Sequence, residues 1–249
     1  MPADSAAVLP SPARPIGRSR PNIHDHPVYR ALPSDAQQRL IAEGVELDLS
    51  GDAQTPLDRD HLWFILSGVL GVFPAASDVC VAPIVSGSVY GWDHALGSSG
   101  SGADVRPLLD VRLFRVPAAA VREALGYDWL SRFIALQAVQ RLTFLEQEAA
   151  CNASHRVSER LAKWLLRLHH GGNGASLRLT QAQLAAMLGV QRTSINAAAS
   201  NLQAMGAVRF SRGKASILDA DSLSDLSCRC GAPPATDHIG EPKLRSGVA

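Results

Sequence analysis

A polar and basic segment, residues 191–196, carries side chains that could bind the edges of nucleic-acid bases. Arg192 can donate two parallel hydrogen bonds to the O6 and N7 atoms of guanine. Its neighbours Gln191, Thr193 and Asn196 are candidates for contacts with other base edges. The segment opens an apolar helical pattern, so we predict that the amino end of a helix presents these groups to the major groove of DNA.

Two short helices around a glycine turn, followed by a hairpin, are predicted to position that segment. Residues 180–183 have the capping-box pattern of a helix start. Ala185, Gly189 and Ile195 have the spacing of a helix-turn-helix core, in which the glycine ends the first helix. Residues 208–218 follow as strand, turn and strand. The alternative, an ordinary helical hairpin inside a core, poorly explains why the second helix opens with polar and basic residues.

Charge is distributed unevenly along the 249 residues. Residues 152–218 hold nine basic residues and one acidic residue, a net charge of +8, although the whole chain carries only +1. Residues 1–151 carry −5 and residues 219–249 carry −2. A basic module on an acidic body is expected of a protein that places one end on phosphates. The candidate phosphate ligands are Thr180, Ser194, Arg209, Arg212 and Lys214.

The amino-terminal part of the chain has the pattern of a small β structure. Short segments with apolar or alternating residues lie between residues 45 and 116, separated by Gly, Ser and Pro turns. This favours an antiparallel β-roll or sandwich, preceded by a helix at residues 32–43. In the apolar stretch 62–92 the only charged residue is Asp78, but its turn residues argue against a membrane-spanning helix.

After residue 117 the apolar spacing becomes helical. Two adjacent apolar stripes follow, which suggests one long helix that packs both on the sheet and on its twin in a second chain. A single wide face buried within one subunit is the alternative. A further helix is predicted at residues 154–169, capped by Ser154. The residues assigned to the dimer contact are Leu130, Ile134, Ala138, Leu142 and Leu145.

Cysteine and histidine residues offer little sign of catalysis or metal binding. Cys228 and Cys230 are separated by one residue, closer than a usual zinc pair, and no second pair accompanies them. We therefore predict no metal site, with a metal or thiol switch in the tail as the alternative. Residues 24–26 and 93–94 are loose catalytic candidates without a nucleophile or phosphate loop at a useful spacing, so we predict no enzyme. We expect a cytoplasmic protein with reduced cysteines.

The layout resembles the Crp/Fnr family of bacterial transcription regulators over about residues 28–226. Beyond the helix-turn-helix pattern, Leu66-Ser-Gly-Val-Leu-Gly-Val and Ser86-Gly-Ser-Val-Tyr-Gly-Trp resemble two β-roll segments of that family. The resemblance implies an α+β chain with a jelly-roll-like antiparallel β-roll, a long dimerisation helix and a winged helix-turn-helix. The predicted parts are a disordered arm (1–27), a sensor β-roll (28–117), a dimerisation helix (118–151), a DNA-binding domain (152–226) and a flexible tail (227–249).

The resemblance also implies a function. The chain would be a homodimeric regulator that binds a near-palindromic site on double-stranded DNA, with RNA polymerase as a further candidate partner. Arg192 matches the family's guanine-reading arginine. Thr193 and Ala197 depart from residues of its best-known members, so we expect a different operator. The alternative is a ligand- or redox-sensing module whose DNA binding is vestigial.

The sensor domain departs from the cyclic-AMP-binding members of the family. In those members a Glu follows the second glycine of the second segment, and an Arg-Ser pair grips the cyclic phosphate; here Trp92 follows Gly91, and residues 93–117 hold no Arg-Ser pair. An indole cannot accept a ribose hydroxyl bond as a carboxylate does. Residues 1–79 also lack the cysteines of an iron–sulfur site. We expect no cofactor and no tight cyclic-AMP binding, and the effector stays open.

Overall fold

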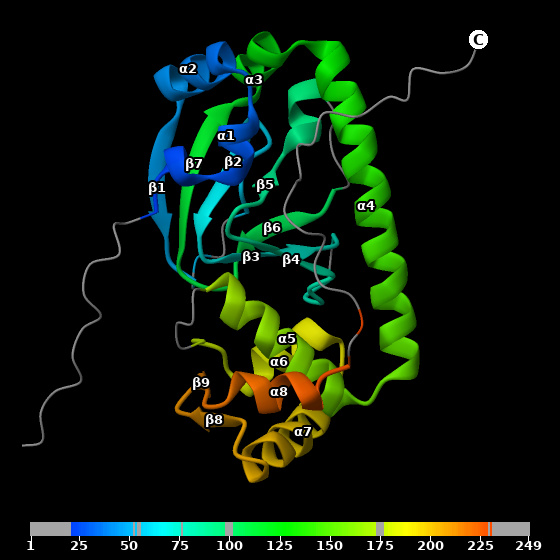
Figure 1. Ribbon diagram of the computed structural model, residues 1–249. Helices are drawn as coiled ribbons and strands as arrows, with labels where there is room; N and C mark the ends of the chain where they lie inside the picture. The colour runs from blue at the N-terminus through cyan, green and yellow to red at the C-terminus, as the bar shows by residue number, and fades with distance from the viewer. Residues whose placement is uncertain are drawn as a thin grey trace, which may run out of the picture.

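The computed structural model describes residues 21–230 apart from 52, 54–55, 76, 98–101, 173–176 and 229. A β-roll, a long helix and a carboxyl-terminal helical domain follow one another along the chain, and the helical domain lies at the end of the molecule away from α2 and α3 (Figure 1). Among these residues, no helix combines the length and apolar character needed to cross a bilayer.

Three short helical elements lead into the β-roll. They are η1 (Ile23–Asp25), α1 (Pro27–Ala31) and α2 (Ser34–Glu43). The predicted disordered arm is wrong over its last residues, because Ile23 is buried and His26 Nε2 lies 3.2 Å from the carbonyl oxygen of Ser88. Residues 1–20 of that arm lie outside the described part of the chain.

Two antiparallel sheets form the roll, which confirms the predicted fold class. The first has the order β1-β7-β2-β5, with bounds Val45–Leu49, Val111–Pro117, His61–Ser67 and Val89–Tyr90. The second has the order β4-β3-β6, with bounds Ala82–Val85, Val69–Phe73 and Asp104–Pro107. Strands β2 and β3, on either side of Gly68, do not pair with each other, whereas the two strands of a simple hairpin would. Gly68, with φ of 90°, instead carries the chain from one sheet to the other.

Strand β2 separates two apolar layers, because successive side chains of a strand point to opposite faces. Leu62 and Phe64 face the cluster that the surrounding helices complete. Trp63 and Ile65 face the cluster between the two sheets. Burial on both faces explains why this strand reads as a continuous apolar run rather than an alternating one.

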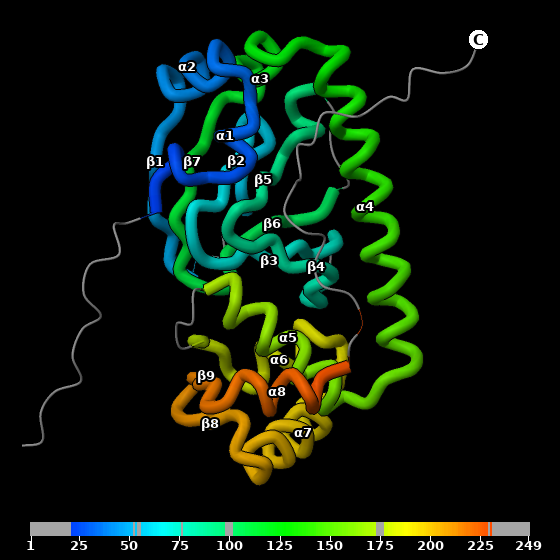
Figure 2. Tube along the Cα trace, in the orientation of Figure 1, coloured from blue at the N-terminus to red at the C-terminus, as the bar shows by residue number. Residues whose placement is uncertain are grey.

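The predicted single helix at residues 118–151 is two helices, α3 (Ala118–Leu125) and α4 (Tyr127–Ser154). Gly126 separates them with φ of 78°, a conformation that few residues other than glycine adopt. The 28 residues of α4 run beside the roll from the α3 end to the level of α5 (Figure 2).

Only part of the predicted dimer stripe on α4 faces outward. Leu130 is fully buried in the subunit's own core, and Ile134 and Leu145 pack against buried residues of the roll. Assigning Leu130 to a dimer contact was wrong, because residues of its own subunit cover it completely. Ile134 and Leu145 are half-buried, so their contact with a second copy stays a prediction. Ala138 and Leu142 are exposed, and their contact with a second copy stays a prediction. The exposed large apolar side chains in the middle of α4 are Leu136 (48%), Val139 (65%) and Leu142 (57%).

The carboxyl-terminal domain consists of α5 (Val157–Gly171), α6 (Gln181–Leu188), α7 (Arg192–Ala204), the hairpin β8–β9 (Val208–Ser211 and Lys214–Ile217) and α8 (Ala220–Leu226). Ser154 was predicted to cap α5. It is instead the last residue of α4. Arg156 takes the cap position, where its NH donates to Glu159 Oε2 at 2.9 Å. The predicted flexible tail is wrong at its start, because Cys228 is buried; residues 231–249 lie outside the described residues.

Candidate nucleic-acid interface

The turn between α6 and α7 has the backbone bonding expected of a helix-turn-helix. The backbone NH of Gln183 donates to Thr180 Oγ1 at 3.1 Å, and the NH of Thr180 donates to Gln183 Oε1 at 2.8 Å. Gly189 ends α6 with φ of 63°, and the NH of Val190 reaches back to Ala185 O at 3.1 Å. The predicted capping box and glycine turn are therefore both present.

Helix α7 has one buried apolar face and one open polar face. Its buried residues are Ile195, Ala198, Ala199 and Leu202, which belong to the same core as α5. The predicted base-reading residues Gln191, Arg192, Thr193 and Asn196 are all exposed. They lie within the first turns of the helix, at the end of the molecule remote from α2 (Figure 1). The apolar face thus anchors the helix and leaves its amino end accessible to a nucleic acid.

The β8–β9 hairpin is fastened to α7 and carries exposed cations. Gln203 Oε1, on α7, accepts the backbone NH of Phe210 at 2.8 Å. A tight turn joins the strands at Arg212 and Gly213, both with positive φ. Arg209, Arg212 and Lys214 are all exposed. The hairpin's backbone is therefore fixed to α7, and it carries three exposed positive side chains of the kind that contact backbone phosphates.

The two uncharged candidates for phosphate contact, Ser194 and Thr180, differ in their burial and in the hydrogen bonds of their hydroxyl groups. Ser194 is half-buried in the first turn of α7. The hydroxyl of Thr180 already donates to Gln183 Oε1 at 2.9 Å while it accepts the NH of the same residue. Its capping role is therefore established by geometry, and its contact with a phosphate stays a prediction.

Three of the nine basic residues counted toward the charge of this domain do not face solvent. Arg160, Lys163 and Arg167 are all buried on α5. Arg160 Nη2 donates to the carbonyl oxygen of Leu188 at 2.8 Å, at the end of α6. These cations hold the domain together, so the net charge of +8 overstates what DNA would meet.

Lys163 and Arg167 converge on Glu148, a buried carboxylate of α4. Lys163 Nζ lies 2.9 Å from both carboxylate oxygens, and Arg167 Nη2 lies 2.8 Å from Oε1. Burial by itself would raise the pKa of Glu148, but the hydrogen bonds and charges of Arg167 and Lys163 outweigh it and lower that pKa. This charged cluster joins the long helix to the first helix of the DNA-binding domain.

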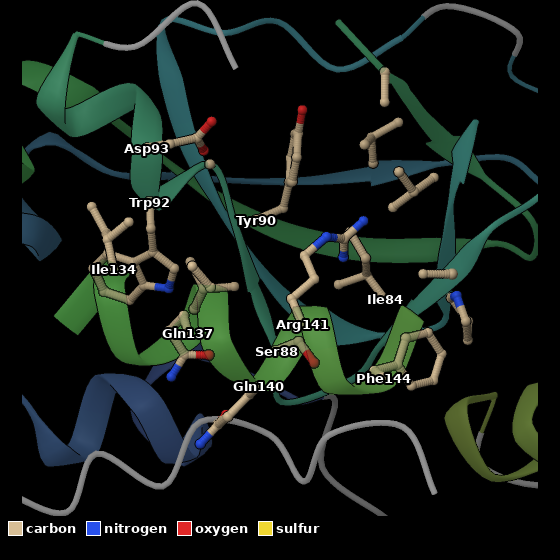
Figure 3. A pocket seen from close by; sticks show the side chains of 18 of the residues that line it. Ile84, Ser88, Tyr90, Trp92, Asp93, Ile134, Gln137, Gln140, Arg141 and Phe144 are labelled. Atoms are coloured by element: carbon tan, nitrogen blue, oxygen red, sulfur yellow. The ribbon is translucent and has the colours of Figure 1, made fainter. Parts of the chain in front are cut away.

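A pocket of about 350 Å³ lies between the roll and α4. Its walls are mostly apolar, and polar groups enter it from both sides: Tyr90 and Asp93 from the roll, and Gln137 and Arg141 from α4. Arg141 extends from α4 toward the strands, between Tyr90 and Ile84 (Figure 3). The cavity was not anticipated from the sequence, because its lining combines segments that are about fifty residues apart.

Trp92 lines the same pocket but mainly serves packing. Its ring lies 4.7 Å from that of Phe133 and 6.2 Å from that of Trp129, both on α4. The indole is buried and therefore takes part in the contact between the roll and the long helix.

The two buried histidines among the loose catalytic candidates, His26 and His94, occupy structural positions. His24 is exposed, whereas His26 is buried edge-on against the ring of Phe64, 5.2 Å between centroids. His94 is buried with Nδ1 2.9 Å from the carbonyl oxygen of His61. Each buried ring is thus bonded to a main-chain oxygen of the roll, as a packing histidine would be.

Comparisons with known proteins agree with this geometry. Residues 159–226 match the Crp-like helix-turn-helix domain. No curated protein matches the chain. Among solved structures, the chain is similar to a Crp/Fnr-family protein from Eubacterium rectale, with a TM-score of 0.61 and 17% identity over 80% of this chain and 97% of that one. It is also similar to FixK2 from Bradyrhizobium japonicum, with a TM-score of 0.57 and 16% identity over 76% and 99%.

A third similar structure is a Crp/Fnr-family transcriptional regulator from Thermus thermophilus, with a TM-score of 0.52 and 24% identity over 76% of this chain and 100% of that one. The similarity to these solved structures concerns the fold. The match to the Crp-like helix-turn-helix domain covers residues 159–226, which include α7 with its exposed polar amino end. The resemblance to the Crp/Fnr family is thereby confirmed: the chain has the fold of Crp/Fnr transcription regulators and carries a Crp-like helix-turn-helix domain.

Proposed function

We propose that this chain is a transcription regulator that binds a near-palindromic DNA site as a homodimer. The observation that carries the proposal is the two-faced helix α7, whose apolar side is buried while Arg192 and its polar neighbours are exposed. Two such helices would enter successive major grooves, about 34 Å apart. The exposed cations of the hairpin would contact the flanking phosphates and orient the domain.

The middle of α4 is the surface we propose for contact with the second copy. Leu136, Val139 and Leu142 are exposed on this helix and follow one another at intervals of three residues. Such a stripe is costly to leave in water and suits packing against the same stripe of a twin helix.

The pocket between the roll and α4 is the effector site in this proposal. Its walls suit a mainly apolar molecule, and the guanidinium of Arg141 would pair with a negative group on it. We propose that cyclic AMP is not bound tightly, because Trp92 stands where a carboxylate would accept the ribose hydroxyl.

Val85 connects the pocket with the DNA-binding domain. It lines the cavity, and a Cβ built on Gly171, at the end of α5, would lie only 2.8 Å from its Cγ1 atom. A ligand that displaces Val85 would therefore press directly on α5. Helix α5 shares its core with α7, so the displacement would reach the base-reading helix.

Selection of binding sites from random double-stranded DNA tests the proposal. We expect a site with two half-sites related by inversion, bound by the full-length chain with strong salt dependence. Arg192→Ala should weaken binding by about 1–3 kcal/mol and relax the preference at one base pair of each half-site. The control is Arg39→Ala, an exposed arginine of α2 at the opposite end of the molecule.

The alternative, a sensing module with vestigial DNA binding, predicts a different result. Selection would then recover no common sequence, and Arg192→Ala would change the affinity no more than Arg39→Ala does. That outcome would refute the proposed function.

A further inference from the structure

Four side chains that commonly bind metals meet where α4 ends and α5 begins. They are Cys151, His155, Cys228 and Cys230. Their sulfur and ring nitrogen atoms all lie within 4.8 Å of one another. Cys151 is in the last turn of α4, and His155 is the residue that caps the carboxyl end of this helix. Cys228 and Cys230 follow α8. In the sequence, no second pair of ligands accompanies Cys228 and Cys230, which argued against a metal site. The fold supplies that second pair.

The spacing of these atoms matches a tetrahedral site. The sulfurs of Cys151 and Cys228 are 3.4 Å apart, and Cys230 Sγ lies 3.5 Å from His155 Nδ1. Around a zinc ion with ordinary bond lengths, two sulfurs would be about 3.8 Å apart, and a sulfur and a nitrogen about 3.5 Å apart. Small side-chain shifts would suffice to close the four ligands around one ion.

The surroundings hold the ligands in place and balance their charge. Lys163 Nζ lies 3.0 Å from Cys151 Sγ, and Lys163 is itself positioned by Glu148. Arg167 Nη2 lies 3.4 Å from the carbonyl oxygen of Cys230, and the NH of Cys228 reaches Glu159 O at 3.3 Å. Three thiolates around a divalent ion leave one negative charge, which the ammonium of Lys163 would offset. Such outer partners orient ligands and tune metal affinity.

We propose that these four residues bind one Zn²⁺ ion per chain. Three thiolates and one imidazole form a donor set typical of structural zinc, and thiolate sulfur disfavours Mg²⁺ or Ca²⁺. Cys151 and Cys228 are buried, and all four ligands are protein atoms, so the site leaves no open coordination position for catalysis.

The ion would tie together two parts of the chain, one with Cys151 and His155 and the other with Cys228 and Cys230. It would fasten the segment after α8 to the junction between α4 and α5, beside the cluster around Glu148. This junction sets the direction of the DNA-binding domain relative to the long helix. The zinc site would therefore be a structural clamp on the hinge between sensing and DNA binding.

The metal content of the full-length protein, purified without a metal-affinity tag, is the direct test. Inductively coupled plasma mass spectrometry should find one zinc ion per chain. Cys230→Ser, a change at a half-buried position, should reduce the bound zinc to a small fraction. Mutating a residue that only contacts a metal ligand lowers metal affinity by roughly 10–100-fold, and the loss of Cys230 should weaken Co²⁺ binding by more than that. The control is Cys80→Ser, because Cys80 is buried where the roll packs on the carboxyl-terminal domain, is not one of the four ligands, and should leave the zinc in place.

Co²⁺ titration adds a spectroscopic readout that a purely structural defect would not produce. The wild-type protein should show the intense visible bands of tetrahedral cobalt and a thiolate charge-transfer band. His155→Ala should alter the visible bands, and His170→Ala, which replaces an exposed histidine of α5, should not. Circular dichroism of each variant establishes that it is folded.

Three results would overturn the proposal. One is folded wild-type protein that neither contains zinc nor binds Co²⁺ in tetrahedral form. A second is zinc retained equally by Cys230→Ser and Cys80→Ser. The third is a zinc-free protein in which alkylation and mass spectrometry find Cys151 and Cys228 joined by a disulfide, which would assign the cluster to thiol redox chemistry instead.

Discussion

Replacing Glu148 by Gln should destabilise the protein far more than an ordinary loss of one charge. The side chain is 8% exposed, and those of Lys163 and Arg167 are 6% and 5% exposed. Removing the carboxylate would leave two cations buried without their counter-charge, which costs about 3–5 kcal/mol for a buried pair. For a chain of this length that corresponds to a decrease in melting temperature of roughly 6–20 °C.

Urea unfolding of the full-length protein measures this change, and Asp78→Asn is its control. Asp78 pairs with Arg106 at 3.2 Å but is 82% exposed, so its loss should cost no more than about 1 kcal/mol. If Glu148→Gln proved no more costly than Asp78→Asn, the three charges could not be buried together, and α5 would not be seated against α4 as described.

Three further perturbations test other parts of the structure. Burial lowers the pKa of His26 to about 4, partly offset by its bond to Ser88, so the unfolded chain binds more protons between pH 6.5 and 4. Stability should therefore fall by about 2 kcal/mol from pH 7.5 to pH 5, and His26→Gln should flatten that slope in urea unfolding. Gly171→Ala should cost about 1–3 kcal/mol, because its methyl would lie 2.7 Å from Val69 Cγ2; an unchanged melting temperature would contradict the packing of α5 on the roll. In sedimentation velocity the wild-type chain should be the proposed dimer and Val139→Asp a folded monomer; a dimer that survives the change would exclude this stripe as the contact.

The helix-turn-helix was predictable because local signals agree there. The cap at Thr180, the glycine turn at Gly189 and the apolar spacing of α7 all operate within a few residues, and each has one structural solution. The exposure of Arg192 followed from the same pattern, since the apolar positions leave only one face for it.

The long helix was less predictable because its apolar residues serve two neighbours. Periodicity shows that Leu130 and Val139 are on different faces, but not which face meets the subunit's own core. In the structure the roll covers Leu130 and leaves Val139 exposed. Only the position of the roll, a tertiary fact, decides between them.

Buried charges and the cysteine cluster were not predictable from one sequence. Lys163 and Arg167 looked like part of a basic surface because their partner Glu148 lies on another helix. Cys228 looked isolated because its neighbours, Cys151 and His155, are distant in sequence. Both arrangements depend on the angle between α4 and α5, which no local pattern encodes.

Methylation interference on the selected DNA site tests the central claim most directly. A methyl group on N7 of one guanine in each half-site should block binding by the wild-type chain, since Arg192 would donate to that atom. The same modification should have no effect on binding by Arg192→Ala. Interference at the same guanine for both proteins, or at none, would contradict the claim that the amino end of α7 reads the bases.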